Sequence, residues 1–178
     1  MKSLKIGFSL FLLLLTSFSA TTAEALELIV DVPRMITYAE GRRNVQLFGD
    51  AGDIAKNVWI QAHVMTYPGN HAGFVFRCDA IMKNYYECII NVHRRKLDLT
   101  VYRNGSAHNI KSVSVPSLVQ NRLYELWVGM YGNRIVVYLD GRWLIDHYDD
   151  TLQTAGFTGT ATYHSGSTFL DLLSYSYD

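Results

Sequence analysis

The 178-residue sequence lacks an excess of charge of either sign, because 16 Lys and Arg residues balance 16 Asp and Glu residues. A zero formal charge gives the chain as a whole no electrostatic footprint for nucleic acid. Beyond residue 23, no apolar run is long enough to cross a bilayer. The sequence also lacks a convincing amphipathic helix, an internal repeat and low-complexity segments. What remains is the pattern of a β protein.

The first 23 residues have the character of a secretory signal peptide. Two lysines give a positive start, residues 6–15 form a short apolar core, and small residues lead to cleavage after Ala23 or Ala25. The apolar core is too short to span a bilayer. We therefore expect residues 1–23 to be removed, leaving residues 24–178 as a single secreted, extracellular domain with no membrane span. An uncleaved membrane anchor is the alternative.

Alternation of apolar and polar residues with period two is clearest in residues 122–147. Turns at Gly132-Asn133 and Asp140-Gly141 separate three runs there, and an Asp-Gly pair favours a type I′ hairpin turn. Further strands are expected at residues 26–32, 44–48, 57–67, 73–78, 85–92, 97–102, 109–115, 157–163 and 168–177. So many short strands must bury their apolar faces against each other. The sequence therefore predicts an all-β fold, a two-sheet antiparallel β-sandwich or jelly roll.

The same alternation predicts which side chains form the core, because successive strand residues point to opposite faces. The predicted core consists of Val58, Ile60, Ala62, Val64, Phe74, Phe76, Ile90, Val92, Leu97, Leu99, Val101, Leu126, Val128, Ile135, Val137 and Leu139. The residues between them in the sequence, among them Trp59 and His63, are then expected to face outward.

The two cysteines are expected to form one disulfide bond, as pairs of thiols in secreted proteins commonly do. Cys78 ends one strand-like run and Cys88 lies within the next. A hairpin centred on Lys83 would place Cys78 directly opposite Cys88, close enough for their Cβ atoms to be bridged. Two buried thiols are the alternative.

A series of short motifs follows a particular order from about Trp59 to the C-terminus. They are AGFVFR at 72–77, NYY at 84–86, KLDL at 96–99, LYELWV at 123–128, IVVYLDG at 135–141, GFTG at 156–159 and FLD at 169–171. Their order resembles the concanavalin A-like lectin/glucanase superfamily, in particular the laminin-G-like jelly rolls. The resemblance implies a concave sheet that often binds glycans. Lectins, adhesion modules and glycoside hydrolases share this fold, so the resemblance does not choose among them.

The face that points away from the predicted core carries interleaved polar and planar side chains. Sugar binding requires such a surface, because aromatic rings stack on pyranose rings while amide and charged groups bond to hydroxyls. The resemblance implies that the strands concerned are neighbours on the concave sheet. The candidate ligand-binding residues are Trp59, His63, Arg77, Glu87 and Asn91. An ordinary solvated sheet face is the alternative.

Catalysis by a glycoside hydrolase needs two carboxylates that flank the scissile bond, and the glucanase branch places them at alternating positions of one strand. No two of the 16 acidic residues are spaced by two. Glu87 and Asp98 could lie on neighbouring strands, either as a catalytic pair or as solvated side chains. We therefore predict no catalytic residue and a module that binds carbohydrate, as a glycan or glycoprotein. A glycoside hydrolase and an adhesion or matrix module that binds a protein are the alternatives.

No cofactor is expected, although Asp140, Asp146, Asp149 and Asp150 raise the question of calcium. Calcium takes several oxygen ligands, and laminin-G-like domains often bind it at a loop rim. These aspartates can equally be solvated loop charges, and the histidines show no zinc-ligand spacing, so no metal site is predicted.

Two further surface features are expected. Asn104-Gly105-Ser106 fits the acceptor pattern for N-glycosylation on a predicted turn, so Asn104 is a candidate glycan attachment site. Residues 93–96, HRRK, form a short basic run. That run is either a solvated strand end or a contact for acidic glycans.

Overall fold

The computed structural model describes residues 27–32, 36–37, 41–48, 54–164 and 167–177. The expected signal peptide, residues 1–23, lies outside the described residues. The strands are β1 (Glu27–Val32), β2 (Ile36–Thr37), β3 (Gly41–Phe48), β4 (Val58–Thr66), β5 (His71–Cys78), β6 (Tyr85–Asn91), β7 (Lys96–Arg103), β8 (Ser106–Ser114), β9 (Leu123–Tyr131), β10 (Arg134–Leu139), β11 (Arg142–Tyr148), β12 (Phe157–His164) and β13 (Ser167–Ser176). Within this described part of the chain, no helix is long and apolar enough to cross a membrane.

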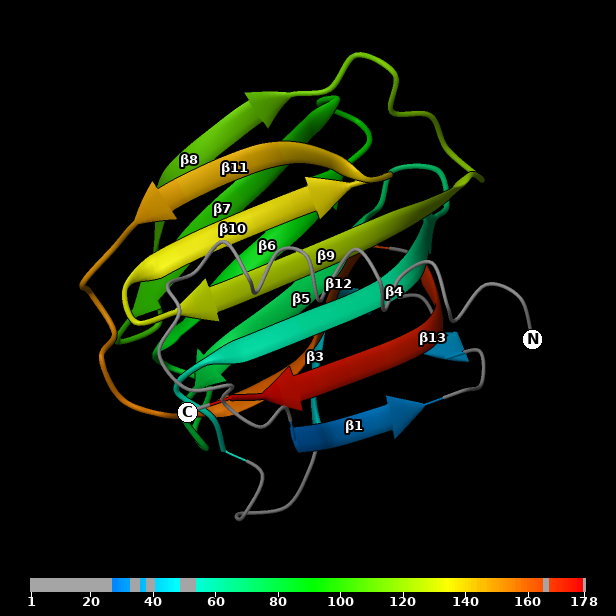
Figure 1. Ribbon diagram of the computed structural model, residues 1–178. Coiled ribbons are helices and arrows are strands. Elements are labelled where there is room, and N and C mark those ends of the chain that lie inside the picture. The colour runs from blue at the N-terminus through cyan, green and yellow to red at the C-terminus, as the bar shows by residue number, and fades with distance from the viewer. Residues whose placement is uncertain (1–26, 33–35, 38–40, 49–53, 165–166, 178) are drawn as a thin grey trace.

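The strands form two antiparallel sheets that lie one behind the other (Figure 1). The first sheet has the order β1-β13-β4-β9-β10-β11, with β2 also paired to β13. The second sheet has the order β3-β12-β5-β6-β7-β8. The two-sheet antiparallel β-sandwich predicted from the alternation is therefore confirmed.

The core lies between the two sheets, and every residue of the predicted core is buried in it. The largest side chains completely enclosed there include Phe74, Phe76, Tyr86 and Phe169. Each large apolar side chain stabilises the fold by about 1.5–3 kcal/mol on burial. The alternation identified these residues correctly because one face of nearly every strand is turned toward the opposite sheet.

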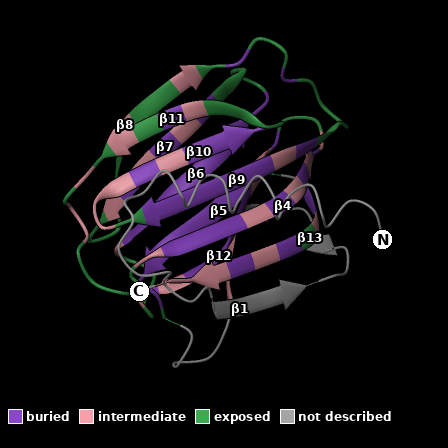
Figure 2. Cartoon of the chain, in the orientation of Figure 1, coloured by how far each residue is buried: buried purple, intermediate pink, exposed green. Residues whose placement is uncertain are grey.

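The central strands β5 and β6 of the second sheet are buried on both faces, as Figure 2 shows. Their outward side chains include Val75, Tyr85 and Ile89, which form a second apolar cluster with side chains of β12. The outward side chains of these strands are therefore covered by neighbouring residues, and Ile89 also lines the site described below.

Two of the predicted Gly-containing hairpin turns have the backbone conformation of a type I′ turn. Asn104 and Gly105 have φ angles of 50° and 78°, and Asp140 and Gly141 have φ angles of 50° and 72°. Two consecutive residues with positive φ are typical of a type I′ turn, which matches the twist of the flanking strands. These turns join β7 to β8 and β10 to β11.

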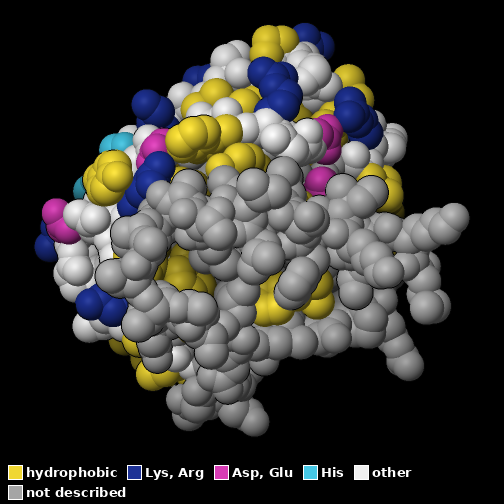
Figure 3. Space-filling model, viewed as in Figure 1, with side chains coloured by type: hydrophobic (Ala, Val, Ile, Leu, Met, Phe, Trp, Pro, Cys, Tyr) yellow, Lys and Arg dark blue, Asp and Glu magenta, His cyan; other side chains and the backbone are white. Residues whose placement is uncertain are grey.

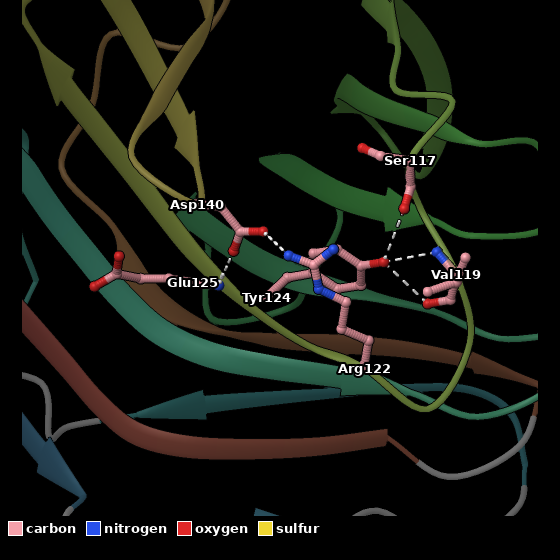
Figure 4. A network of polar contacts seen from close by, with 6 residues as sticks. All are labelled: Ser117, Val119, Arg122, Tyr124, Glu125 and Asp140. Atoms are coloured by element: carbon pink, nitrogen blue, oxygen red, sulfur yellow. Dashed lines mark hydrogen bonds and ion pairs between the residues drawn. The ribbon is translucent and has the colours of Figure 1, made fainter.

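A polar network fixes the start of β9 against the turn between β10 and β11 (Figure 4). The Tyr124 hydroxyl accepts a hydrogen bond from the Val119 backbone N–H at 2.6 Å. Arg122 pairs with Asp140 at 2.8 Å and lies over the Tyr124 ring, and the Glu125 backbone N–H donates to Asp140 at 3.0 Å. Asp140 therefore has a structural role on both sides of its turn.

The predicted disulfide bond between Cys78 and Cys88 is wrong, since neither cysteine is disulfide-bonded. Cys88 pairs across the hairpin with Phe74, whereas Cys78 pairs with Phe157 of β12. The Asp79 carboxylate accepts hydrogen bonds from the backbone N–H groups of residues 83 and 84, which sets the turn two residues earlier than expected. Cys88 points into the main core and Cys78 into the outer cluster, so the sheet itself separates the two thiols.

Candidate functional site

The five candidate ligand-binding residues do not share one face. Trp59 and His63 lie on β4, whose neighbours in the first sheet are β13 and β9. Glu87 and Asn91 lie on β6 in the second sheet, on the opposite side of the sandwich. The expected adjacency of these strands is therefore wrong. The chain crosses to the other sheet at the turn after β4, and alternation within single strands contains no information about such a crossing.

Trp59 faces away from the main core as expected, but its ring is not open to a ligand. The side chain is 5 % exposed and packs edge-on against Trp127, with ring centroids 5.7 Å apart. Tyr138 completes this aromatic cluster. A Cβ atom on Gly129 would come within 2.6 Å of the Trp59 ring, so the glycine makes room for it. His63 lies further along β4, with its Nδ1 atom 3.7 Å from Asp171.

The outer face of the first sheet carries hydrophobic and basic side chains side by side where it is visible in Figure 3. Trp143 and Tyr148 of β11 are 55 % and 62 % exposed. The Trp143 ring stacks on Tyr138 with centroids 6.1 Å apart, and its indole N–H donates to the Ile145 carbonyl. Trp143 thus packs on the edge strand of the first sheet, with one face of its ring against Tyr138 and the other exposed.

Arg77 of β5 is a buried structural residue. It is 2 % exposed and has a positive φ angle of 49°. Its guanidinium donates to the backbone carbonyls of Lys56 and Leu152 at 2.7 Å each, and to that of Gly132. Burial lowers the pKa of Arg77. The side chain therefore joins three loops at one end of the sandwich.

Glu87 and Asn91 line a groove on the outer face of the second sheet, with a volume of about 430 Å³. Binding pockets for small ligands have volumes of a few hundred Å³ or more, so the groove is large enough for a sugar. Strands β5, β6, β7, β8 and β12 all contribute to it. The other groove residues used below are His71, Arg94, Lys96, Asp98, Tyr102, Ser112 and Tyr163.

Glu87 lies deep in the groove and is only 4 % exposed. The Tyr163 hydroxyl lies 2.7 Å and 2.8 Å from its two carboxylate oxygens and donates to them. The hydroxyl of Tyr102 lies 3.1 Å from that of Tyr163. Tyr102 in turn stacks on Tyr85, with centroids 4.3 Å apart and planes inclined by 15°. The two tyrosines thus reach toward each other from β7 and β12, and Tyr163 links this pair to the Glu87 carboxylate.

Asp98 lies on β7, next to β6, as the sequence analysis anticipated for Glu87 and Asp98. Ser112 donates to Asp98 at 2.6 Å, and the Asn91 amide nitrogen lies 3.5 Å from the other carboxylate oxygen. Asp98 pairs with Ile89 and not with Glu87 itself, so the two acids are diagonal neighbours. Diagonal positions are about 7–8 Å apart in an antiparallel sheet.

His71 stands at the end of the groove, beside Tyr163, with ring centroids 6.2 Å apart. Burial lowers the pKa of His71, and the nearby His164, His93 and Arg94 lower it further. The imidazole is therefore neutral at pH 7 and presents one donor and one acceptor nitrogen.

The four aspartates considered for calcium are each held by protein groups. Asp140 binds Arg122, and Asp146 binds Arg134 at 2.8 Å and 2.7 Å. Separate hydrogen bonds hold Asp149 to Tyr86 and Asp150 to Asn133. Among the described residues, no group of three or more His, Cys, Asp and Glu side chains is placed to hold a metal ion.

The sequence analysis found Glu87, Asn91 and Asp98 but missed His71, Tyr102 and Tyr163. Tyr102 could have been found, because it continues the outward alternation of β7 from Asp98. Tyr163 could not, because its place beside Glu87 depends on β12 pairing with β5, far away in the sequence.

No protein family and no curated protein matches the chain by sequence. Solved structures do resemble it. The carbohydrate-binding module CBM66 from Bacillus subtilis has a TM-score of 0.71 at 18 % identity, over 89 % of this chain and 100 % of that one. A β-glucanase from Bacillus licheniformis has a TM-score of 0.56 at 12 % identity, over 88 % and 99 %. A galectin from Caenorhabditis elegans has a TM-score of 0.50 at 9 % identity, over 84 % and 99 %. The protein has the concanavalin A-like jelly-roll fold that these structures share.

Proposed function

We propose that the protein is a secreted carbohydrate-binding module and that the groove on the second sheet holds the sugar. The observation that carries the proposal is the convergence of Tyr102, Tyr163, Glu87 and Asn91 in one depression of suitable size. Phenol rings offer flat apolar faces, while the carboxylate and amide can bond to several hydroxyls. Two similar structures, a carbohydrate-binding module and a galectin, support the same interpretation.

Binding without turnover is part of the proposal. Both oxygens of Glu87 already accept the hydroxyl of Tyr163, and Asp98 is held by Ser112. A general acid or nucleophile must instead reach the glycosidic bond directly. The diagonal placement of the two acids nevertheless favours a glycoside hydrolase as the second candidate function.

A glycan array probed with the purified protein, followed by titration calorimetry with the best ligand, tests the proposal. Tyr102→Ala should weaken binding by about ten-fold or more, since it removes a ring that faces the groove. His63→Ala is the matched control on the opposite sheet and should leave the affinity unchanged. Circular dichroism of both variants checks that they remain folded. If only His63→Ala loses binding, the sugar binds to the first sheet and the proposed groove is not the site.

Incubation of the bound glycan with the protein separates binding from hydrolysis. Unchanged glycan after long incubation supports a binding module. If the unaltered protein releases shorter sugars and Glu87→Gln does not, the protein is a glycoside hydrolase and the proposal of a binding module is wrong. An array that stays blank, together with capture of a defined protein partner, would point to an adhesion module instead.

A further inference from the structure

The acidic groups of the groove have hydrogen-bond partners within the described part of the protein, and its Arg and Lys side chains do not. The carboxylates of Glu87 and Asp98 both accept hydrogen bonds from neighbouring side chains. The exposed side chains of Arg94 and Lys96 line the same groove, yet among the described residues neither has a partner in an ion pair or a side-chain hydrogen bond. The carboxylates of the groove thus already have hydrogen-bond donors, whereas its two cations are open to an anionic ligand.

The two cations lie together at one end of the groove. Asn91 at the end of β6 pairs with His71 on β5 and with Lys96 on β7, so the three form one row across the sheet. Arg94 lies in the turn between β6 and β7, where its backbone N–H donates to the Asn91 side chain at 3.0 Å. Asn91 thereby fixes the turn that carries Arg94 beside Lys96.

The row also contains a neutral donor. His71 is neutral at pH 7, and its imidazole can bond to an oxygen without adding charge. A guanidinium presents a flat fork of donors that fits a carboxylate or sulfate, and an ammonium adds a point charge. Glu87 lies four residues before Asn91 on β6, and the Tyr163 hydroxyl points to it, so an anionic group bound by Arg94 and Lys96 would leave the rings of Tyr102 and Tyr163 for the sugar.

We propose that the glycan bound in this groove carries an anionic substituent, a carboxylate or a sulfate ester, and that Arg94 and Lys96 bind it at the end of the groove beside His71. This inference rests on the proposed function, because it names the class of sugar for the same site. The chemistry is shared by uronic acids and sulfated sugars, so the test has one arm for each.

Each arm compares two polymers with the same sugar backbone, one with its anionic groups and one in which they are esterified or removed. Polygalacturonate is compared with its fully methyl-esterified form, and a sulfated galactan with the same galactan after desulfation. The protein should bind the charged member of at least one pair about ten-fold more tightly than the neutral member. Raising the salt concentration should weaken binding to the charged member only, since exposed charge pairs are screened.

The variants Arg94→Gln and Lys96→Gln should each reduce the preference for the charged member by about two- to five-fold, the range for exposed ion pairs. Arg142→Gln removes an exposed cation from β11 of the other sheet and should leave the preference unchanged. Equal binding of charged and neutral members would overturn this inference while leaving carbohydrate binding intact. Failure to bind any glycan, in these pairs or on the array, would overturn the proposed function itself.

Discussion

Removal of the Arg77 side chain should destabilise the fold strongly. The guanidinium is buried and donates to three backbone carbonyls, two of them at 2.7 Å. Each hydrogen bond to a charged group contributes about 1.5–3 kcal/mol net. Once the side chain is removed, water can form some of the hydrogen bonds to the three carbonyls. Arg77→Ala should therefore lower the free energy of unfolding by about 3–5 kcal/mol. That is a large share of the 5–15 kcal/mol typical of a folded domain.

Urea denaturation followed by tryptophan fluorescence measures this loss, and calorimetry should show a melting temperature lower by roughly 6–20 °C. Two further variants separate the causes. Arg77→Lys keeps the charge but has one ammonium that cannot reach three separate carbonyls, so its loss should be intermediate. Arg77→Gly loses the same hydrogen bonds as Arg77→Ala, but glycine adopts the positive φ angle without strain and should recover about 1 kcal/mol. A loss below 1 kcal/mol in Arg77→Ala would refute the structural role assigned to this side chain.

Three further outcomes are expected. Cys78 and Cys88 should resist alkylation in the folded protein, because both are fully buried and burial raises the pKa of the Cys88 thiol. Both should react once the protein is denatured without reductant, because neither is in a disulfide bond. A protein mass two daltons below that of the dithiol form would reveal a disulfide and contradict this. The hydrogen bond from Arg134 lowers the pKa of Asp146, so Asp146→Asn should cost up to about 1 kcal/mol at pH 7, and this cost should shrink as the pH falls through the lowered pKa of the folded state; a cost that does not change with pH would contradict this. Asn104 is exposed on its turn, so secretion from a eukaryotic cell should add a glycan that Asn104→Gln abolishes, as mass spectrometry can detect.

The sequence was sufficient to predict the core and most strands, because both depend on the order of neighbouring residues. Val58 and Ile60, for example, are buried because their strand alternates, whichever strand lies beside it. The register of the hairpin between β5 and β6 could not be predicted from the sequence in the same way. It depends on hydrogen bonds from backbone N–H groups to Asp79, and a shift of two residues was enough to separate the two cysteines.

The candidate site was predicted only in part, for a different reason. Glu87 and Asn91 were found because outward polar residues on a strand can be read from alternation alone. Trp59 was wrongly predicted to share a face with Glu87 and Asn91, because the residues of a strand do not show to which sheet that strand belongs. An outward position also did not mean an exposed one, since Trp127 and Tyr138 cover the Trp59 ring.

The order of strands in the sheets also has a consequence for how the protein folds. β12 pairs with β3 and β5, and β13 pairs with β1 and β4, so the late strands are inserted between early ones. The contact between Tyr163 and Glu87 joins residues 76 positions apart. Such long-range pairing slows folding, into the range of milliseconds to seconds for β-sandwiches of small size. During synthesis, one edge of β4 and one edge of β5 therefore have no native partner until β13 and β12 have been made, and aggregation competes with folding over that interval.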